Sequence, residues 1–292
     1  VNIFGVNDEV WKMAVIDQIE KVQHTSNLYY TEPCTKLAEL LCEKTGMKKV
    51  FFSNSGAEAN ECAIKAARRY AYTKKTGRYE FIAMQNSFHG RSFGAVSVTG
   101  HDSYREPFEP VVPGVRFAEF NDLDSVKALV NDKTCAIILE TIQGEGGINA
   151  ATKEFMQGIR KICDENGILM ICDEVQCGMG RTGTLFCYEQ YGIEPDVITS
   201  SKALGGGLPI GACLCTERLG DVLNSGMHGS TFGGNPVACA GALSVLERVS
   251  DETFLQEVKA KGEYMQQKLS EMEGVAEVRG IGMMIGIVLE KG

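Results

Sequence analysis

The stretch ITSSKALGGGLPIG, residues 198–211, places one lysine, Lys202, between a short apolar run and three consecutive glycines. The preceding residues DVITSS, 196–201, have the composition of a buried strand. The glycines leave open space beside the lysine and allow the chain to turn sharply. Taken alone, Lys202 is either a solvated surface charge or an amine held in a pocket, so the rest of the chain must decide between these two interpretations.

Short apolar runs alternate with amphipathic segments on both sides of this stretch. The predicted strands are KVFFSNS (49–55), CAIILE (135–140), ILMICDEV (168–175), DVITSS (196–201) and ACLCTE (212–217). The predicted helices are 7–23, 35–46, 55–75, 155–167 and 236–249. Continuous apolar strands between amphipathic helices predict an α/β fold, with a largely parallel sheet covered on both faces. Ligands of such sheets bind at the carboxyl ends of the strands.

The pattern changes after Val249. A charged helix is predicted over 251–272, followed by two strands around a glycine within 276–290. This change indicates a second, smaller α/β domain. We therefore expect residues 1–16 to be part of an N-terminal segment, 17–249 to form the large domain and 250–292 to begin the small domain.

Composition and charge exclude several classes of protein. A chain of 292 residues can bury a sizeable core, and a net charge of −9 with dispersed basic residues argues against binding to nucleic acid or anionic membranes. The 11 cysteines include no CxxC pair, and Cys213 and Cys215 are expected to pack in the core rather than bind metal. The sequence has no bilayer-spanning apolar run and no signal peptide, so a cytoplasmic protein is expected.

The motif SNSGAEAN, 53–60, lies at a predicted strand-to-helix junction. The free backbone N–H groups and the positive end of a helix that begins here suit a phosphate group. A purely structural alternative is a capping box, in which Ser55 caps the helix and Glu58 completes it. This motif alone does not separate the two interpretations.

Carboxylates follow two other predicted strands. Asp173 ends ILMICD, and Glu140 and Glu145 lie in ETIQGEGG, 140–147. Each could simply cap a turn. Together with Lys202 at a neighbouring strand end and the phosphate cradle, however, they form the set that pyridoxal phosphate needs: a phosphate anchor, a carboxylate for the pyridine nitrogen and an amine for covalent attachment.

A dinucleotide site is the main alternative that the motifs raise. GMGRTG, 178–183, matches GxGxxG after a strand. The segment that follows, TLFCYEQYG, is not a typical helix, and the acidic pair Asp173 and Glu174 would face the pyrophosphate. The pattern therefore favours an ordinary turn.

The sequence resembles the class III aminotransferases of the ornithine and acetylornithine type, which have pyridoxal-phosphate fold type I. The matching stretches occur in the family's order, almost from end to end: HTSNLYY, FFSNSGAEANECAIKAARR, SFHGRS, ETIQGEGG, ICDEVQCGMGRTG, SSKALGGGLPIGA, HGSTFGGNPVACA and VRGIGMMIG. The resemblance implies a large domain with a mostly parallel mixed sheet, plus part of a smaller C-terminal domain. In the family, roughly thirty-five residues precede the counterpart of VNIFGVN and several dozen follow that of GIVLEKG.

The resemblance also implies the residues that bind pyridoxal 5'-phosphate: Ser55, Gly56, Ala57, Phe88, Asp173, Val175, Gln176, Lys202 and Thr231. Lys202 and Asp173 would be catalytic. Lys202 would bind the cofactor covalently and then carry a proton, and Asp173 would pair with the protonated pyridine nitrogen. Phe88 and Val175 would cover opposite faces of the ring, and Gln176 would reach its 3-oxygen.

The phosphate would be held by the residues of the SGA turn and by Thr231 of a neighbouring subunit, which implies a homodimer. The substrate-binding residues implied are Asn27, Arg91, Glu145 and Arg279. Arg279 would clamp an α-carboxylate through its guanidinium fork, and Glu145 would pair with this arginine when the other substrate is bound. Arg91 would bind a second carboxylate.

The implied reaction moves the ω-amino group of a donor to 2-oxoglutarate, giving a semialdehyde and glutamate. HTSNLYYTEP and His89 of SFHGRS are closest to the acetylornithine enzymes of arginine biosynthesis. The alternatives are ornithine or succinyl-diaminopimelate as donor, an aminomutase, or a member that only binds a ligand. Thr141 stands where the family usually has proline, a change expected to affect loop stiffness more than chemistry.

Overall fold

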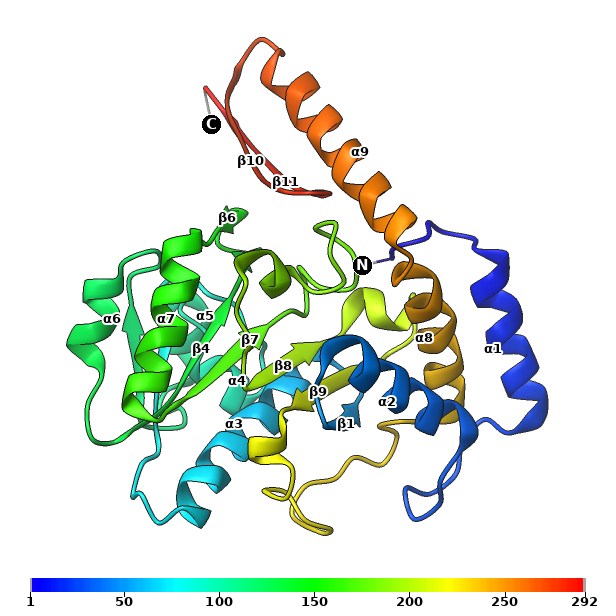
Figure 1. Ribbon diagram of the computed structural model, residues 1–292, viewed down its shortest axis with the longest axis horizontal. Coiled ribbons are helices and arrows are strands. Elements are labelled where there is room, and N and C mark those ends of the chain that lie inside the picture. The colour runs from blue at the N-terminus through cyan, green and yellow to red at the C-terminus, as the bar shows by residue number, and fades with distance from the viewer. Residues whose placement is uncertain (1, 291–292) are drawn as a thin grey trace.

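The computed structural model describes residues 2–290. A seven-stranded sheet with the strand order β1-β9-β8-β7-β4-β2-β3 forms its centre (Figure 1). Its strands are β1 (Lys49–Ser53), β2 (Glu80–Met84), β3 (Val115–Ala118), β4 (Thr134–Glu140), β7 (Leu169–Asp173), β8 (Val197–Ser200) and β9 (Gly211–Cys215). Two short sheets pair β5 (Ile142–Gln143) with β6 (Asn149–Ala150) and β10 (Val275–Ile281) with β11 (Met284–Leu289).

Helices cover both faces of the main sheet. They are α1 (Glu9–Lys21), α2 (Glu32–Thr45), α3 (Gly56–Thr73), α4 (Phe93–Ser97), α5 (Asp102–Arg105), α6 (Leu123–Leu129), α7 (Lys153–Asn166), α8 (Pro236–Val249) and α9 (Glu252–Ser270). Short 3₁₀ turns are η1 (Glu106–Phe108), η2 (Cys187–Tyr191), η3 (Lys202–Gly205) and η4 (Glu217–Leu219). The pattern confirms the predicted α/β architecture.

Strand direction explains where a site can form. Only β9 among these seven strands runs against its neighbours, because it pairs antiparallel with β1 and β8 while the other pairs are parallel. In register, Glu140 lies opposite Asp173, and Asp173 lies opposite Thr199. The carboxyl ends of β1, β4, β7 and β8 therefore meet at one edge of the sheet, where α/β proteins bind their ligands.

The two faces of the sheet bury different residues of the same strands. Ile137 and Leu139 of β4 belong to a core that includes α2, α7 and α8, whereas Ala136 and Ile138 belong to a core built with α3. Side chains alternate between the faces of a strand, so a strand buried on both sides must be apolar throughout. This is why β4 and β7 are uninterrupted apolar runs in the sequence.

Local signals set most helix boundaries. The Asp8 carboxylate accepts the N–H of Trp11 at 2.8 Å and starts α1 at Glu9, and Gly46, with φ 73°, ends α2. Two strands of the main sheet, β2 and β3, are not among the strands predicted from the sequence. β3 has only four residues and one buried side chain, Ala118, so its apolar pattern is weak.

The C-terminal segment forms a separate layer, in which α9 and the β10–β11 hairpin project from the main body (Figure 1). Gly282, with φ 56°, lies between the two strands, which confirms the predicted pair of strands around a glycine. The expected division at residue 16 falls inside α1, which packs on α8. The domain boundaries remain predictions.

The GMGRTG segment forms turns after β7, and no α-helix follows it directly. Gly180 and Gly183 have positive φ, and a Cβ at either position would collide with the side chain of Val249 or Lys259 respectively. These glycines thus let α8 and α9 approach the loop. The structure agrees with the ordinary turn rather than with a dinucleotide site.

Candidate active site

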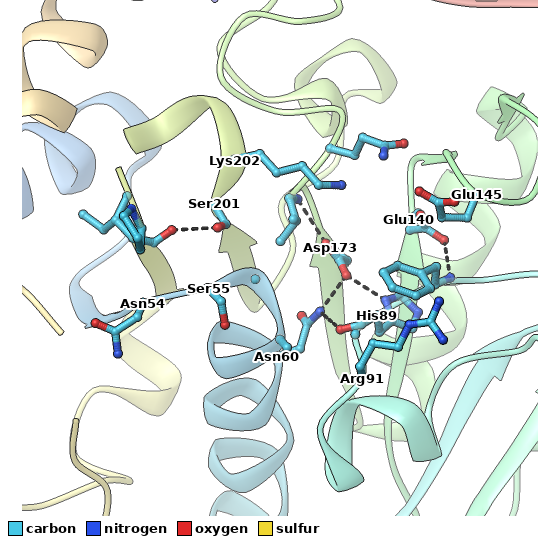
Figure 2. Close-up of a pocket in the computed structure, with 18 of the residues that line it drawn as sticks. Asn54, Ser55, Asn60, His89, Arg91, Glu140, Glu145, Asp173, Ser201 and Lys202 are labelled. Atoms are coloured by element: carbon cyan, nitrogen blue, oxygen red, sulfur yellow. Dashed lines mark hydrogen bonds and ion pairs between the residues drawn. The ribbon is translucent and has the colours of Figure 1, made fainter. Parts of the chain in front are cut away.

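A cavity of about 440 Å³ lies at the carboxyl ends of β1, β4, β7 and β8 (Figure 2). Residues from five separate parts of the chain line it. The predicted site residues that it brings together are Ser55, Gly56, Ala57, Phe88, Arg91, Glu145, Asp173, Val175, Gln176 and Lys202. The structure thus supports a pocket position for Lys202 over the solvated surface charge that the sequence also allowed.

Lys202 begins the turn η3, just after β8 ends at Ser200. Its φ is 44°, a left-handed value that is uncommon for a residue with a side chain. The hydroxyl of Ser201 donates to the carbonyl of Ile210 at 2.6 Å and fixes the start of this turn. In Figure 2 the Lys202 side chain extends into the cavity on the side of Asp173. Strained backbone of this kind persists where the surroundings hold it, and it gathers at functional sites.

The start of α3 forms one end of the cavity. The Ser55 hydroxyl accepts the N–H of Glu58 at 3.2 Å, which is half of the capping box. The second hydrogen bond of the capping box has a different donor. The Glu58 carboxylate accepts the backbone N–H of Asn54, at 2.7 Å, instead of that of Ser55. The N–H groups of Gly56 and Ala57 belong to the first turn, where a helix offers no internal partners. Capping and anion binding are therefore compatible at this junction.

Glycines allow close packing at this end of the cavity. A Cβ on Gly56 would lie 2.7 Å from Cγ1 of Val175, and one on Gly90, whose φ is 130°, would lie 2.7 Å from Cβ of Ala57. The start of α3 can therefore lie against both of these loops. A dianionic phosphate fits this arrangement of N–H groups, helix dipole and open space.

A hydrogen-bonded network fixes the carboxylate of Asp173 at the floor of the cavity. Its Oδ2 accepts from Nδ2 of Asn60 and from Nδ1 of His89, each at 2.7 Å, and its Oδ1 accepts the N–H of Val175 at 3.0 Å. Thr199 in turn donates to Oδ1 of Asn60 at 2.8 Å. The network leaves Asp173 4% exposed, so the carboxylate is oriented but nearly removed from solvent.

His89 is the buried partner of this carboxylate. Burial lowers the pKa of His89, but the hydrogen bond to Asp173 and the charges of Asp173 and Glu140 outweigh it and raise the pKa above its usual value. The sequence predicts no role at Asp173 for Asn60 or His89, although His89 belongs to the family motif SFHGRS. Only the approach of α3 and of the loop before α4 to β7 shows that both side chains orient Asp173.

Glu140 lies beside this pair at the end of β4. Its carboxylate accepts the N–H groups of Phe88 at 3.0 Å and Gly144 at 3.3 Å. Burial, together with the charge of Asp173, raises the pKa of Glu140 to about 7, although His89 and the two N–H groups act in the opposite direction. This carboxyl group therefore changes its charge near neutral pH, next to the cavity.

Glu140 makes the stability of the protein depend on pH. Its pKa rises from an ordinary 4.5 to about 7 on folding, so between these values the folded state keeps a proton that the unfolded chain has lost. The contribution of Glu140 to the free energy of unfolding must then fall as pH rises from 4.5 to 7, by on the order of 2 kcal/mol. Glu140→Gln should make the decline in stability with pH smaller by this amount, measured by denaturant unfolding at pH 5, 6, 7 and 8.

The exposed substitution Glu39→Gln on α2 is the matched control and should give a curve parallel to that of the unmodified protein. Equal pH slopes for Glu140→Gln and the unmodified protein would contradict the assignment.

Thr141 and Glu174 link two loops behind the cavity. Thr141 donates to the Glu174 carboxylate at 3.2 Å, and this carboxylate also accepts the N–H groups of Cys187 and Tyr188, both at 2.8 Å. Burial raises the pKa of Glu174 to about 7. A proline at 141 would lack the hydroxyl, so this departure from the family adds a hydrogen bond between loops as well as changing loop stiffness.

The two arginines predicted to bind substrate, Arg91 and Arg279, lie in different cavities. Arg91 lines the main cavity, and its guanidinium carbon lies 4.1 Å from the centroid of the Tyr104 ring. Arg279 lines a neighbouring cavity of about 510 Å³ instead, where Nε donates to the carbonyl of Gly147 at 2.7 Å and Nη1 lies 3.6 Å from Glu277. Within residues 2–290 the structure contains no ion pair between Arg279 and Glu145.

Asn27 and Thr231 also lie outside the main cavity. They share a shallow depression with Ser230, whose carbonyl accepts from Nδ2 of Asn27 at 2.5 Å. Phe232 beside them is 59% exposed, and Leu28 is 86% exposed. In a single chain, therefore, neither Asn27 nor Thr231 contacts the cavity that contains Lys202.

Other kinds of site lack support in the part of the chain that the structure describes. Across residues 2–290 no cluster of three His, Cys, Asp or Glu side chains could hold a metal ion, and Cys213 and Cys215 are buried in the core beside α3, as expected. None of the helices described is long and apolar enough to cross a membrane.

Comparisons with known proteins give one consistent result. The family model described as aminotransferase class-III matches residues 1–292. The chain is 49% identical over 291 residues to an acetylornithine aminotransferase of Caldanaerobacter subterraneus, covering 98% of this chain and 74% of the relative. It is 46% identical over 300 residues to a succinylornithine transaminase of Yersinia pseudotuberculosis, covering 99% and 72%.

A solved structure agrees with these sequence matches. An ornithine aminotransferase from Toxoplasma gondii, described with partial occupancy of pyridoxal phosphate at its active site, superposes with a TM-score of 0.92 at 30% identity. The match covers 97% of this chain and 69% of that one.

Proposed function

The chain belongs to the class-III aminotransferases, and from this premise we propose that it transfers the terminal amino group of N-acetylornithine to 2-oxoglutarate. The products are the corresponding semialdehyde and glutamate, as in arginine biosynthesis. The observation that carries the proposal is the cavity itself. It holds the Lys202 amine, the oriented Asp173 carboxylate and the N-terminus of α3 around one space of about 440 Å³.

The residues present fit pyridoxal phosphate, on which enzymes of this family depend. When bound, the cofactor supplies an electron sink for the charge left on the substrate carbon after a proton is removed. Gly56 and Ala57 would hold its phosphate at the start of α3. The Asp173 carboxylate would hold a proton on the pyridine nitrogen, because Asn60, His89 and the N–H of Val175 fix its orientation.

Lys202 would have two tasks in succession. Its amine would hold the cofactor covalently, and the same amine would also serve as the base that moves a proton from the substrate carbon. η3 places this amine in the same cavity as Asp173. Phe88, Val175 and Gln176 line that cavity and would contact the ring.

Two arginines support a substrate with carboxylate groups. Arg91 is exposed at the cavity and stacked on Tyr104, so its guanidinium is held for a carboxylate. Arg279 would have to leave the carbonyl of Gly147 to reach the same substrate. Glu145 lines the main cavity and would pair with Arg279 in one half of the reaction.

A related acyl donor is the second candidate. The succinylornithine transaminase matches this chain at 46% identity, close to the 49% of the acetylornithine enzyme, so similarity alone does not separate an acetyl from a succinyl group. Ornithine and succinyl-diaminopimelate were the alternatives raised by the sequence. An aminomutase is disfavoured, because Arg91, Glu145 and Arg279 are the residues that accommodate two different substrates in turn.

We propose further that the active form is a homodimer. Thr231 and Asn27 lie away from the cavity of their own chain, beside exposed apolar residues, which suits a contribution to the cavity of a second subunit. Thr231 would complete the phosphate site of that subunit. The cysteines are unpaired thiols, as expected in a reducing compartment, and we place the enzyme in the cytoplasm.

A donor panel tests the proposed reaction. N-acetylornithine, N-succinylornithine, ornithine, succinyl-diaminopimelate and 4-aminobutyrate are each supplied with 2-oxoglutarate, and glutamate is measured. We expect kcat/KM for N-acetylornithine to exceed that for ornithine at least about tenfold, because the free α-ammonium of ornithine is repelled by a cavity that contains Arg91. A higher value for ornithine would contradict the acyl preference, and no glutamate from any donor would contradict the proposed function.

A further inference from the structure

The chain's single tryptophan contacts the turn that carries Lys202, on the side away from the active-site cavity. Trp11, in α1, donates its indole Nε1–H to the carbonyl of Gly205 at 3.1 Å, across 194 residues of sequence. Gly205 is the last residue of η3, which begins at Lys202. We propose that Trp11 is a positioning residue, which holds the Lys202 amine in its reactive place by fixing the far end of this turn.

The turn also has restraints of its own, because Leu204 within it is fully buried and its amides form hydrogen bonds. Leu204 donates to the carbonyl of Ser201 at 2.9 Å, and Gly206 donates to that of Ala203 at 3.1 Å. The carbonyl of Gly205 accepts twice, from the N–H of Leu208 at 3.2 Å and from the indole of Trp11. Because Lys202 has a strained φ of 44°, the bond from Trp11 adds a restraint at the far end of the turn that opposes relaxation.

Two glycines form the slot that receives the indole. A Cβ on Gly206, whose φ is 60°, would lie 2.5 Å from the indole Nε1, and one on Gly241 of α8 would lie 2.9 Å from the same atom. Any side chain at either position would push the ring away from the carbonyl of Gly205. The slot therefore fits a flat ring that carries one N–H donor, which explains tryptophan at this position.

The helix that carries Trp11 is itself fixed. The Asp8 carboxylate accepts the backbone N–H of Trp11 at 2.8 Å and also accepts Nη1 of Arg248, at the end of α8, at 2.8 Å. The hydrogen bond from Arg248 lowers the pKa of Asp8. Asp8 thus joins the start of α1 to the end of α8, and both helices pack against each other along their lengths.

The contact between Trp11 and Gly205 lies close to the active-site cavity. Gly207 lines both the main cavity and a second cavity of about 260 Å³, which Trp11 and Gly206 also line. The η3 turn and the glycines after it therefore form the partition between the two spaces. The glycines give this partition little stiffness, and the indole hydrogen bond supports it on its outer side.

The inference rests on the proposed role of Lys202, and Trp11→Phe tests it. Phenylalanine keeps most of the ring but removes the N–H donor. In the cofactor-loaded enzyme, hydrogen exchange at the amides of Leu204 and Gly206 should become about fivefold faster, as expected for the loss of one hydrogen bond. The value of kcat should fall by a similar factor while KM for the donor stays unchanged, because Trp11 lies outside the cavity.

Val15→Ala provides the matched control. Val15 lies one turn further along α1 and packs on Gly241 of α8, but makes no hydrogen bond to η3. This variant should lower the melting temperature and leave both kcat and the exchange of the two amides as they are. If Trp11→Phe changes neither exchange nor kcat, or if Val15→Ala reproduces its effects, the inference is wrong.

A different result would contradict the proposed function. If Lys202→Ala kept full turnover, the catalytic assignment would be lost whatever Trp11 does. Faster exchange in Trp11→Phe without any change in kcat would show that the bond holds the turn but does not position the amine, which would also overturn the inference.

Discussion

Replacing Lys202 by alanine is expected to lower the rate of glutamate formation by roughly 10³-fold or more. The substitution removes the amine that is proposed both to bind the cofactor and to move the substrate proton, and general acid–base catalysis alone contributes about 10²–10⁴-fold. The visible absorption band that comes from the bond between Lys202 and the cofactor should also disappear. Both quantities are measured on purified protein after incubation with pyridoxal phosphate.

Lys161→Ala is the control, because the Lys161 side chain is 74% exposed and no residue of α7 lines the cavity. It should retain full activity and the absorption band. More than a tenth of normal turnover in Lys202→Ala would contradict the assignment.

The Lys202→Ala variant also tests the proposed dimer. If Thr231 serves the neighbouring subunit, mixing Lys202→Ala with Thr231→Ala and allowing subunits to exchange should create one intact site in each mixed dimer. Activity should then rise above that of either variant alone. No recovery, in a mixture shown by mass spectrometry to contain mixed dimers, would contradict the position proposed for Thr231.

Changing Asp173 to asparagine is expected to lower kcat/KM by roughly 10²–10³-fold. Asparagine has nearly the same shape but no charge, so it cannot hold a proton on the pyridine nitrogen through a charge-assisted bond. It also leaves His89, which is fully buried, without its ionic partner. The measurement is steady-state kinetics with the best donor and 2-oxoglutarate, together with circular dichroism to show that the variant is folded.

Asp132→Asn removes one negative charge at an exposed position and should leave kcat/KM unchanged. A folded Asp173→Asn variant with kcat/KM within threefold of the unmodified enzyme would show that Asp173 does not act on the cofactor. Such a result would leave the role of Lys202 untouched, since the two side chains are proposed to act on different atoms.

Much of the fold could be predicted from the sequence because the signals are local. Apolar runs such as CAIILE predict strands buried on both faces, and Gly46 predicts the end of a helix, without knowledge of any distant residue. The strand ends at Asp173 and before Lys202 were located in the same way. β3 could not be predicted in this way, because a short, half-exposed strand has almost no periodic pattern.

The candidate site was predictable in its members but not in its contacts. Motifs in the family's order indicated Lys202, Asp173 and the start of α3, and the structure places these around one cavity. The same motifs did not indicate that Arg279 binds the carbonyl of Gly147 in a neighbouring cavity, or that Asn27 lies away from the cavity of its own chain.

What the sequence determined by itself is therefore the order of strands and helices and the chemical groups delivered at the strand ends, because turn chemistry and periodicity act over a few residues. Only the tertiary structure determined which distant residues contact and orient those groups. Asn60 meets Asp173 across 113 residues, and Trp11 meets Gly205 across 194. No local pattern encodes such pairs, since each forms only when the sheet brings α3 to β7, and when α1 packs on α8 behind the turn of Lys202.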